Sequence, residues 1–213
     1  MSPRTAGPST PVGPAALAAT CRLVERLFDE VQPTQLGWPT PCALWTVADV
    51  MEHIVASTDF FADAAANGAV ADDRPWPSYA PADLPDALRH HDARLLAAFR
   101  DPRALDRPIV LPAGPGTAQL ALEIAVSEQL VHAWDLAAAI GARVPEEYDP
   151  VAASLLGSAT YVVVNDEVRA ASDAPLGPAR AVGPDARPLD RLVAFLGRDP
   201  AFRTARGGHP PLR

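Results

Sequence analysis

The alanine-rich stretch between Thr117 and Gly141 constrains the fold most, because it predicts one long helix with a largely apolar surface. Thr is a residue type that caps helix N-termini, and Gly commonly stands where a helix ends. In the middle of this stretch, Glu128 and His132 stand four residues apart among apolar neighbours. A helix of this kind packs against other helices, and its polar pair needs a chemical reason.

Apolar residues also recur at helical spacing in five other segments, which Pro, Gly and Asp-Pro pairs separate. The expected helices span residues 14–31, 46–67, 83–101, 149 to about 170, and 189–197. A short extended excursion is expected in RPIVLPAGPGT, residues 107–117. We therefore predict an all-α fold, a helical bundle followed by a C-terminal helical extension.

The expected helices divide the chain into four parts. Residues 1–13 are rich in Pro, Ser, Gly and Thr without periodicity, which predicts a flexible leader. The helical bundle spans 14–141 and the C-terminal helical extension spans 142–200. Residues 201–213 are expected to form a flexible tail.

Composition excludes several classes of function. With a net charge of -8 over 213 residues, the chain offers no basic stripe for nucleic acid. No secretory h-region is present, and no run reaches the roughly 18 apolar residues of a membrane span, so we expect a cytoplasmic protein with a small-molecule partner. Cys21 and Cys42 fit no CxxC spacing and are expected to pack as thiols, with a pocket-lining role for Cys42 left open. A homodimer also stays open.

Glu128 and His132 have the spacing of two metal ligands on one helix. Residues four apart lie on the same helix face, about 6 Å apart along the axis. That face carries the apolar stripe, and a buried carboxylate is costly unless a cation or donor meets it. Imidazole and carboxylate are standard ligands of a divalent cation. His53 is the other histidine expected on an inward stripe, and three ligands would leave a coordination position open for water or substrate.

A simpler interpretation stands beside the metal. Glu128 and His132 can form a charged pair, and a buried histidine is often satisfied by one backbone carbonyl. His90, His91 and His209 are expected at the surface or in the tail, without a role. The spacing alone leaves both interpretations open.

Three further residues are pocket candidates. Trp45 and Trp134 are large enough to wall a pocket, although core packing is the alternative for both. Ser57 lies on an inward face, as does Ser127, but the chain has neither a GxSxG elbow nor an SxxK motif, which favours packing over nucleophilic catalysis. No catalytic residue is assigned.

Two strings are similar to one known family. TPCALWTVADVMEHIV (residues 40–55) and SEQLVHAWDLAAAIG (residues 127–141) resemble motifs of the actinobacterial DinB-like metal-binding proteins, the subgroup related to the N-terminal domain of mycothiol-dependent maleylpyruvate isomerase. ARPLDRLVAFLGRDP (residues 186–200) resembles the C-terminal element of the same subgroup. The resemblance covers most of the chain from residue 14 to residue 200.

This resemblance implies a DinB-like four-helix bundle that binds a divalent metal through His53, Glu128 and His132. Zinc is the first candidate, with nickel and iron as alternatives, and mycothiol is the implied cosubstrate. Other DinB-like thiol transferases carry histidine where Glu128 stands, whereas the isomerase-like branch carries the carboxylate, which lowers the charge at the site.

The implied activity is that of a thiol transferase or isomerase, in which the metal activates a low-molecular-weight thiol, or water, against a small electrophile. The alternatives are a hydrolase, cyclase or lyase that uses no thiol, and a metal-stabilised small-molecule-binding protein without catalysis. The isomerase itself has a larger C-terminal domain that supplies a basic residue, and nothing after Gly141 resembles it. Arg169, Arg180 and Arg191 are the candidates for that role.

Overall fold

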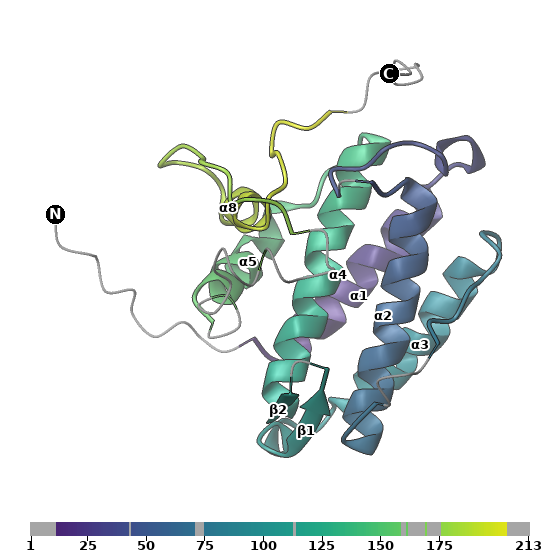
Figure 1. Cartoon of the computed structure of the whole chain (residues 1–213), viewed down its shortest axis with the longest axis vertical. Coiled ribbons are helices and arrows are strands. Elements are labelled where there is room, and N and C mark those ends of the chain that lie inside the picture. Colours follow the sequence, from purple (N-terminus) through teal and green to yellow (C-terminus); the bar gives the residue numbers. More distant parts are fainter. Residues whose placement is uncertain are drawn as a thin grey trace, which may run out of the picture.

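The computed structural model describes residues 12–42, 44–70, 75–112, 114–158, 161, 169 and 176–203. Within them the chain is mostly helical (Figure 1), which confirms the predicted all-α fold. The helices are α1 (Pro14–Glu30), α2 (Val47–Asn67), α3 (Leu84–Ala98), α4 (Ala118–Ile140), α5 (Asp149–Leu156) and α8 (Pro188–Phe195). Short 3-10 turns are η1 (Pro33–Gln35), η2 (Pro102–Ala104) and η3 (Glu146–Tyr148).

Helices α1 to α4 form the expected four-helix bundle. Helix α2 packs against α3 and α4, and α1 packs against the same two helices from the other side. Figure 1 shows the four helices aligned along the long axis of the molecule. Their apolar faces meet in one core, so the bundle holds α2 and α4 in a fixed relation, and these two helices carry the predicted ligands.

Helix α4 is the central helix, and most of its residues are buried. It begins and ends where the sequence predicts, because the Thr117 Oγ1 accepts a hydrogen bond from the Leu120 N–H and Gly141 adopts a left-handed φ of 80°. Helix α2 begins with a capping box between Thr46 and Asp49. Among the described residues, no helix combines the length and apolarity that crossing a membrane requires.

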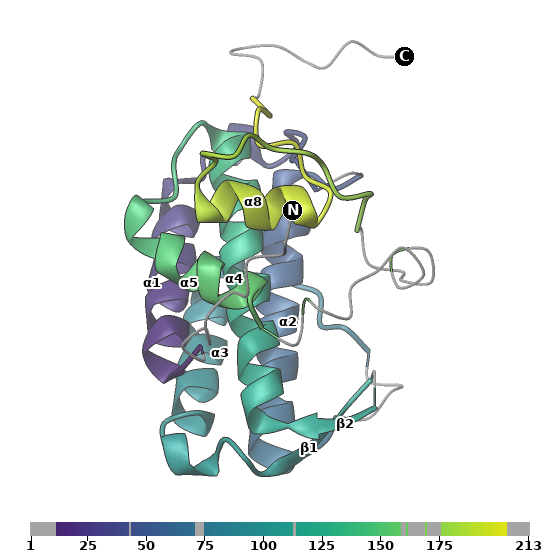
Figure 2. The same cartoon turned by 90° about the vertical axis from the view of Figure 1, so that its left-hand side faces the viewer.

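The expected extended excursion is a β-hairpin that leads from α3 into α4. Strand β1 (Pro108–Leu111) pairs antiparallel with β2 (Gly114–Thr117), so that Pro108 faces Thr117. The hairpin lies at the N-terminal end of α4, and Figure 2 shows it at the far end of the bundle from α8.

The C-terminal extension covers one side of α4. Helices α5 and α8 pack on each other and against α4 (Figure 2), with Leu189, Leu192 and Val193 of α8 buried. The described part of the fifth helix ends at Leu156. Its expected continuation to about residue 170 lies largely outside the described residues, as do residues 1–11 of the expected leader and 204–213 of the expected tail.

Gly197 provides a test of how tightly the extension is packed. Its φ is 90°, and a Cβ at this position would lie 2.5 Å from the Gly177 Cα. We expect Gly197→Ala to lower the free energy of unfolding by about 1–3 kcal/mol from backbone strain alone. Gly183→Ala is the matched control, because a Cβ there meets open space. Equal urea-unfolding midpoints for the two variants would contradict this packing.

Candidate metal centre

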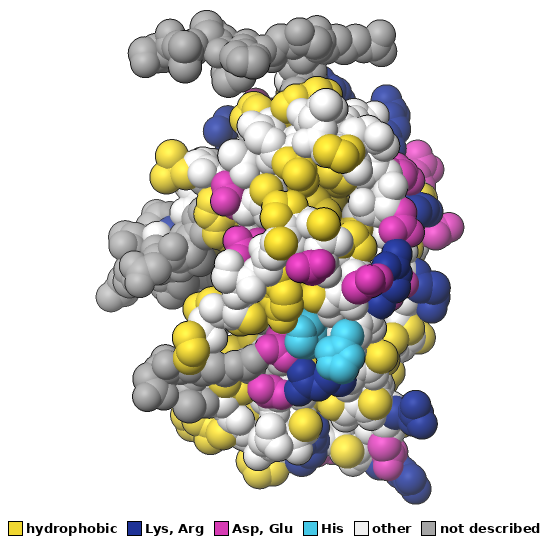
Figure 3. All heavy atoms as spheres, turned by 90° about the vertical axis from the view of Figure 1, so that its right-hand side faces the viewer, with side chains coloured by type: hydrophobic (Ala, Val, Ile, Leu, Met, Phe, Trp, Pro, Cys, Tyr) yellow, Lys and Arg dark blue, Asp and Glu magenta, His cyan; other side chains and the backbone are white. Residues whose placement is uncertain are grey.

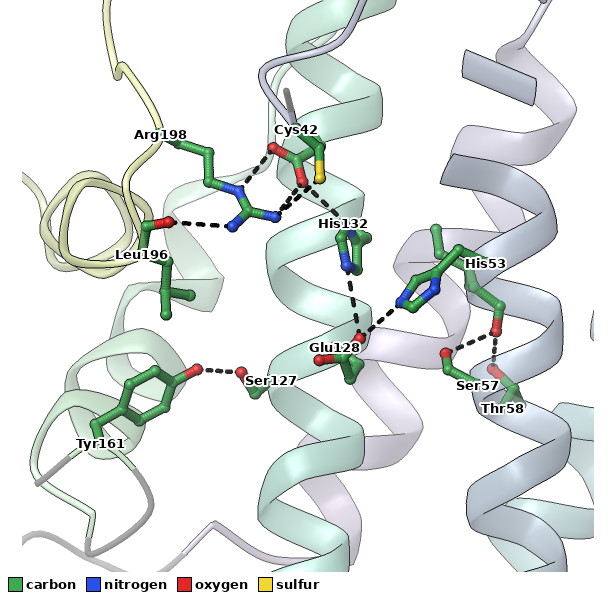
Figure 4. A network of polar contacts seen from close by, with 12 residues as sticks. Cys42, His53, Ser57, Thr58, Ser127, Glu128, His132, Tyr161, Leu196 and Arg198 are labelled. Carbon is green, nitrogen blue, oxygen red and sulfur yellow. Dashed lines mark hydrogen bonds and ion pairs between the residues drawn. The ribbon is translucent and has the colours of Figure 1, made fainter. Parts of the chain in front are cut away.

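The bundle brings the three predicted ligands together across the contact of α2 and α4. The His53 Nε2 lies 2.9 Å from the Glu128 Oε2, and the His132 Nε2 lies 3.5 Å from the same oxygen. Figure 4 shows both imidazole rings pointing toward the Glu128 carboxylate. His53 and Glu128 thus lie in one site although they stand 75 positions apart in the chain.

The spacing of these atoms fits a divalent cation. Bonds of about 2.1 Å to a tetrahedral ion place neighbouring ligand atoms about 3.4 Å apart. The two imidazole nitrogens and the carboxylate oxygen all lie within 4.8 Å of one another, and the two shorter distances bracket that value. Two histidines and one glutamate leave a coordination position for an exogenous ligand.

Charges at the site also suit a cation. Burial alone would raise the pKa of Glu128, but hydrogen bonds from His132 and His53 outweigh it and hold that pKa well below its usual range. Burial would lower the pKa of His132, but Asp135 and Glu128 raise it to about 9. Without metal at neutral pH, His132 is therefore protonated, and a metal ion at its Nε2 would take the place of that proton.

The burial of the three residues is uneven. The His132 side chain is 6% exposed, whereas His53 is 24% and Glu128 is 33% exposed. Glu128 is thus less buried than its place on the apolar stripe predicts. His53 and Glu128 are therefore the two partly exposed members of the group.

Asp135 and Arg198 hold His132 from the side of its ring that faces away from Glu128. The His132 Nδ1 lies 3.0 Å from the Asp135 Oδ2, which leaves the Nε2 free to face Glu128. The Arg198 Nη2 donates to the same Asp135 oxygen over 3.1 Å, and the Arg198 Nη1 donates to the Leu196 carbonyl over 3.2 Å. Figure 4 shows this chain of contacts from the extension to the site.

A second group of potential ligands overlaps the first. Cys42, His132 and Asp135 also present ligand atoms within 4.8 Å of one another. However, the Arg198 Nη2 donates to the Cys42 Sγ over 3.3 Å, and burial raises the pKa of this thiol to about 12 although Arg198 acts the other way. The Arg198 guanidinium thus lies against Cys42 and Asp135, and the Cys42 thiol stays protonated. Both features disfavour metal binding by Cys42, His132 and Asp135.

A hollow of about 400 Å³ opens in front of His53. Trp45 and Trp76 lie on two sides of the imidazole, with ring centroids 4.6 Å and 5.9 Å from it. The rim includes Asp49 and Glu52. Trp45 therefore occupies the wall that the sequence suggested, and Trp76 is an additional wall residue that the sequence analysis missed.

The other two pocket candidates lie elsewhere. The buried Ser57 hydroxyl donates to the Ile54 carbonyl of its own helix over 3.1 Å (Figure 4). Trp134 lines a separate cavity of about 550 Å³ at the C-terminal end of α4. The Ser127 hydroxyl is hydrogen-bonded to the Tyr161 hydroxyl. These contacts place neither serine beside the three ligands.

The three candidate arginines donate hydrogen bonds to backbone carbonyls of the C-terminal extension and not to the three candidate ligands. Arg169 donates to the Gly177 and Phe195 carbonyls, Arg180 to the Gly197 carbonyl, and Arg191 to the Ala186 and Pro184 carbonyls. Arg198 is the cation of the extension that contacts this region. Its sequence context carries no signal for that role, whereas Asp135 could have been found, because it stands three residues after His132 on the same helix face.

His91 is not the surface residue that the sequence predicted. It is buried, with its Nε2 2.8 Å from the Tyr79 hydroxyl and its Nδ1 2.9 Å from the Asp59 Oδ1. Arg94 is bonded to Asp59 and Asp63, and Figure 3 shows histidine, arginine and acidic side chains close together on this face. The Tyr79 contact ties the segment that carries Trp76 to α3. His90 is exposed as expected, and His209 lies outside the described residues.

Comparison with known proteins identifies similar sequences and folds. Residues 17–137, which include all three ligands, match the family model of the mycothiol maleylpyruvate isomerase N-terminal domain. Two uncharacterized proteins of Mycobacterium tuberculosis, from strains CDC 1551 / Oshkosh and ATCC 25618 / H37Rv, are 31% identical over 175 residues, which span 81% of this chain and 90% of theirs.

Two crystal structures are similar in fold. They are the mycothiol-dependent maleylpyruvate isomerase and a mutant of it, with TM-scores of 0.52 and 0.53 and identities of 17% and 16%. The match covers 66% of this chain and 66% of each of those chains, just under two thirds of their length. At this identity the likeness shows the helical fold.

Asp135→Asn tests the support of His132. An amide at this position keeps the shape but removes the charge that orients the imidazole, so we expect zinc affinity to fall about 10–100-fold. Asp149→Asn is the matched control, because Asp149 pairs with Arg187 in the same extension and does not contact the site. Competition with a chelating dye measures both affinities. Equal affinities in the parent protein and Asp135→Asn would contradict the assigned role.

Proposed function

Because the chain belongs to the family of the mycothiol maleylpyruvate isomerase N-terminal domain, we propose that it is a metal-dependent enzyme that activates a low-molecular-weight thiol, such as mycothiol, against a small electrophile. One observation carries the proposal. His53, Glu128 and His132 converge from two helices, with an open hollow beside them. A closed structural metal site would have four protein ligands and no such opening.

A bound divalent cation, with zinc as the first candidate, would supply the Lewis acidity that keeps a thiol ionised at neutral pH. His53 and His132 would hold it from α2 and α4, and Glu128 would supply the negative charge. The Glu128 carboxylate is negatively charged, whereas a third histidine would be a neutral ligand. With Glu128 the bound ion would therefore carry less net positive charge and would activate water or a thiol less strongly. The carboxylate therefore favours an acidic ligand such as a thiol over water.

Other residues of the chain position these groups. Asp135 accepts from the His132 Nδ1 and thereby directs the Nε2 toward the ion. Trp45 lies near both imidazoles, tilted against His53 with a centroid distance of 4.6 Å and stacked on His132 with a centroid distance of 5.5 Å. The indole shields one side of the two rings from water, so ligands approach from the hollow.

A spectroscopic titration tests the proposal. Cobalt-loaded protein is titrated with mycothiol, and we expect a sulfur-to-cobalt absorption band that saturates at about one thiol per protein. S-methylated mycothiol, which cannot form a thiolate, should produce no band. The Cys42→Ser variant should give the same band as the parent protein, which excludes the protein's own thiol as its source.

Failure of this titration has a definite meaning. If mycothiol leaves the cobalt spectrum unchanged, no thiol binds the metal and the proposed activity is wrong. Hydrolysis of an ester or amide by the same cobalt-loaded protein would then indicate activated water instead.

A further inference from the structure

The hollow beside the candidate metal centre carries negative charge and no compensating cation among its described lining residues. Its described lining includes Asp49 and Glu52 but neither lysine nor arginine. Glu128 adds a third carboxylate next to the hollow, because its Oε2 lies 2.9 Å from the Nε2 of the lining residue His53. A divalent cation held there would still leave these groups with a net negative charge, and a bound thiolate would increase it.

Arg198, the described arginine that is hydrogen-bonded to Asp135, cannot contact a substrate in the hollow. Arg198 is 4% exposed and lies behind His132, where Asp135 accepts from its Nη2 over 3.1 Å. Figure 4 shows it on the side of His132 away from His53. A carboxylate entering the hollow therefore meets acidic side chains and no guanidinium among the described lining residues.

The walls of the hollow favour a flat ligand. Trp76 is 59% exposed although its ring lies parallel to His53 and close to Phe60, with interplanar angles of 21° and 14°. Leu44 at the mouth is fully exposed and has a φ of 74°, which is uncommon for leucine. Exposed apolar groups gathered around one opening are typical of a ligand site, and indole faces attract cations but not anions.

We propose, building on the proposed function, that this hollow takes a flat electrophile without negative charge, which Trp45 and Trp76 hold and for which Asp49 and Glu52 together set the charge preference. Neutral and cationic electrophiles enter, and carboxylates are turned away by Asp49 and Glu52. The dicarboxylate maleylpyruvate, the substrate in the name of the similar crystal structures, is thus a poor fit to this chain.

Binding of three probes that share a fluorophenyl ring and differ in charge tests this preference. Fluorine NMR measures the Kd of 4-fluorobenzyl alcohol, 4-fluorobenzyltrimethylammonium and 4-fluorobenzoate with zinc-loaded and metal-free protein. We expect the alcohol and the ammonium to bind about tenfold more tightly than the benzoate, since two partly exposed carboxylates each repel it modestly.

Variants separate the charge from the ring contacts. Glu52→Gln should reduce the preference against benzoate about threefold, as one of two repelling charges is lost. Glu147→Gln, an exposed carboxylate on η3, is the matched control and should leave the preference unchanged. Trp76→Ala should weaken the binding of all three probes by a similar factor. Asp49 is left intact in these tests because it caps α2.

Three results would overturn the inference: benzoate binding as tightly as the alcohol in both forms of the protein, no binding of any probe, or equal effects of Glu52→Gln and Glu147→Gln. Any of them would leave the proposed function standing if mycothiol still generates the cobalt band. Conversely, if the probes show the charge preference but mycothiol produces no cobalt band, the proposed thiol activity is wrong and the hollow is still a ligand site.

Discussion

The Glu128 carboxylate lies between two imidazoles and links α4 to α2. Glu128 on α4 lies within 2.9 Å of His53 on α2 and 3.5 Å of His132 one turn along its own helix. Placing a carboxylate at a helix contact is costly unless cationic or donor groups meet it. Both histidines meet it here, and this contact holds the pKa of Glu128 low, while Asp135 and Glu128 together raise the pKa of His132. The same charge balance suits a divalent cation in place of the proton on the His132 Nε2.

The C-terminal extension is linked to this site by a buried ion pair. Asp135 binds both His132 and Arg198, and the Arg198 side chain is almost fully enclosed. Removing one partner of such a pair leaves an uncompensated buried charge and typically costs about 3–5 kcal/mol. Arg198 lies outside the residues 17–137 that match the family model. A part of the chain beyond the matched bundle thus helps to set the orientation of the His132 imidazole.

Much of the bundle and the candidate ligands on α4 could be predicted from local sequence, and the rest depends on tertiary contacts. Thr117 and Gly141 mark the ends of α4 because capping is a local effect, and the spacing of Glu128 and His132 places both on one face. Arg198 could not be assigned, because it reaches Asp135 only after Gly197 turns the chain with a positive φ. The burial of His91 was missed for a similar reason, since Tyr79 comes from a Pro-containing segment without periodicity. Trp76 belongs to that same segment.

Elemental analysis of the untagged protein, purified without chelator, tests the metal centre most directly. The parent protein is compared with His53→Ala and with His90→Ala, whose side chain is exposed and contacts none of the three ligands. The account predicts about one equivalent of zinc, nickel or iron in the parent and in His90→Ala, and little in His53→Ala. A parent protein without metal, even after reloading, would contradict it and leave Glu128 with His53 and His132 as an ion-paired cluster.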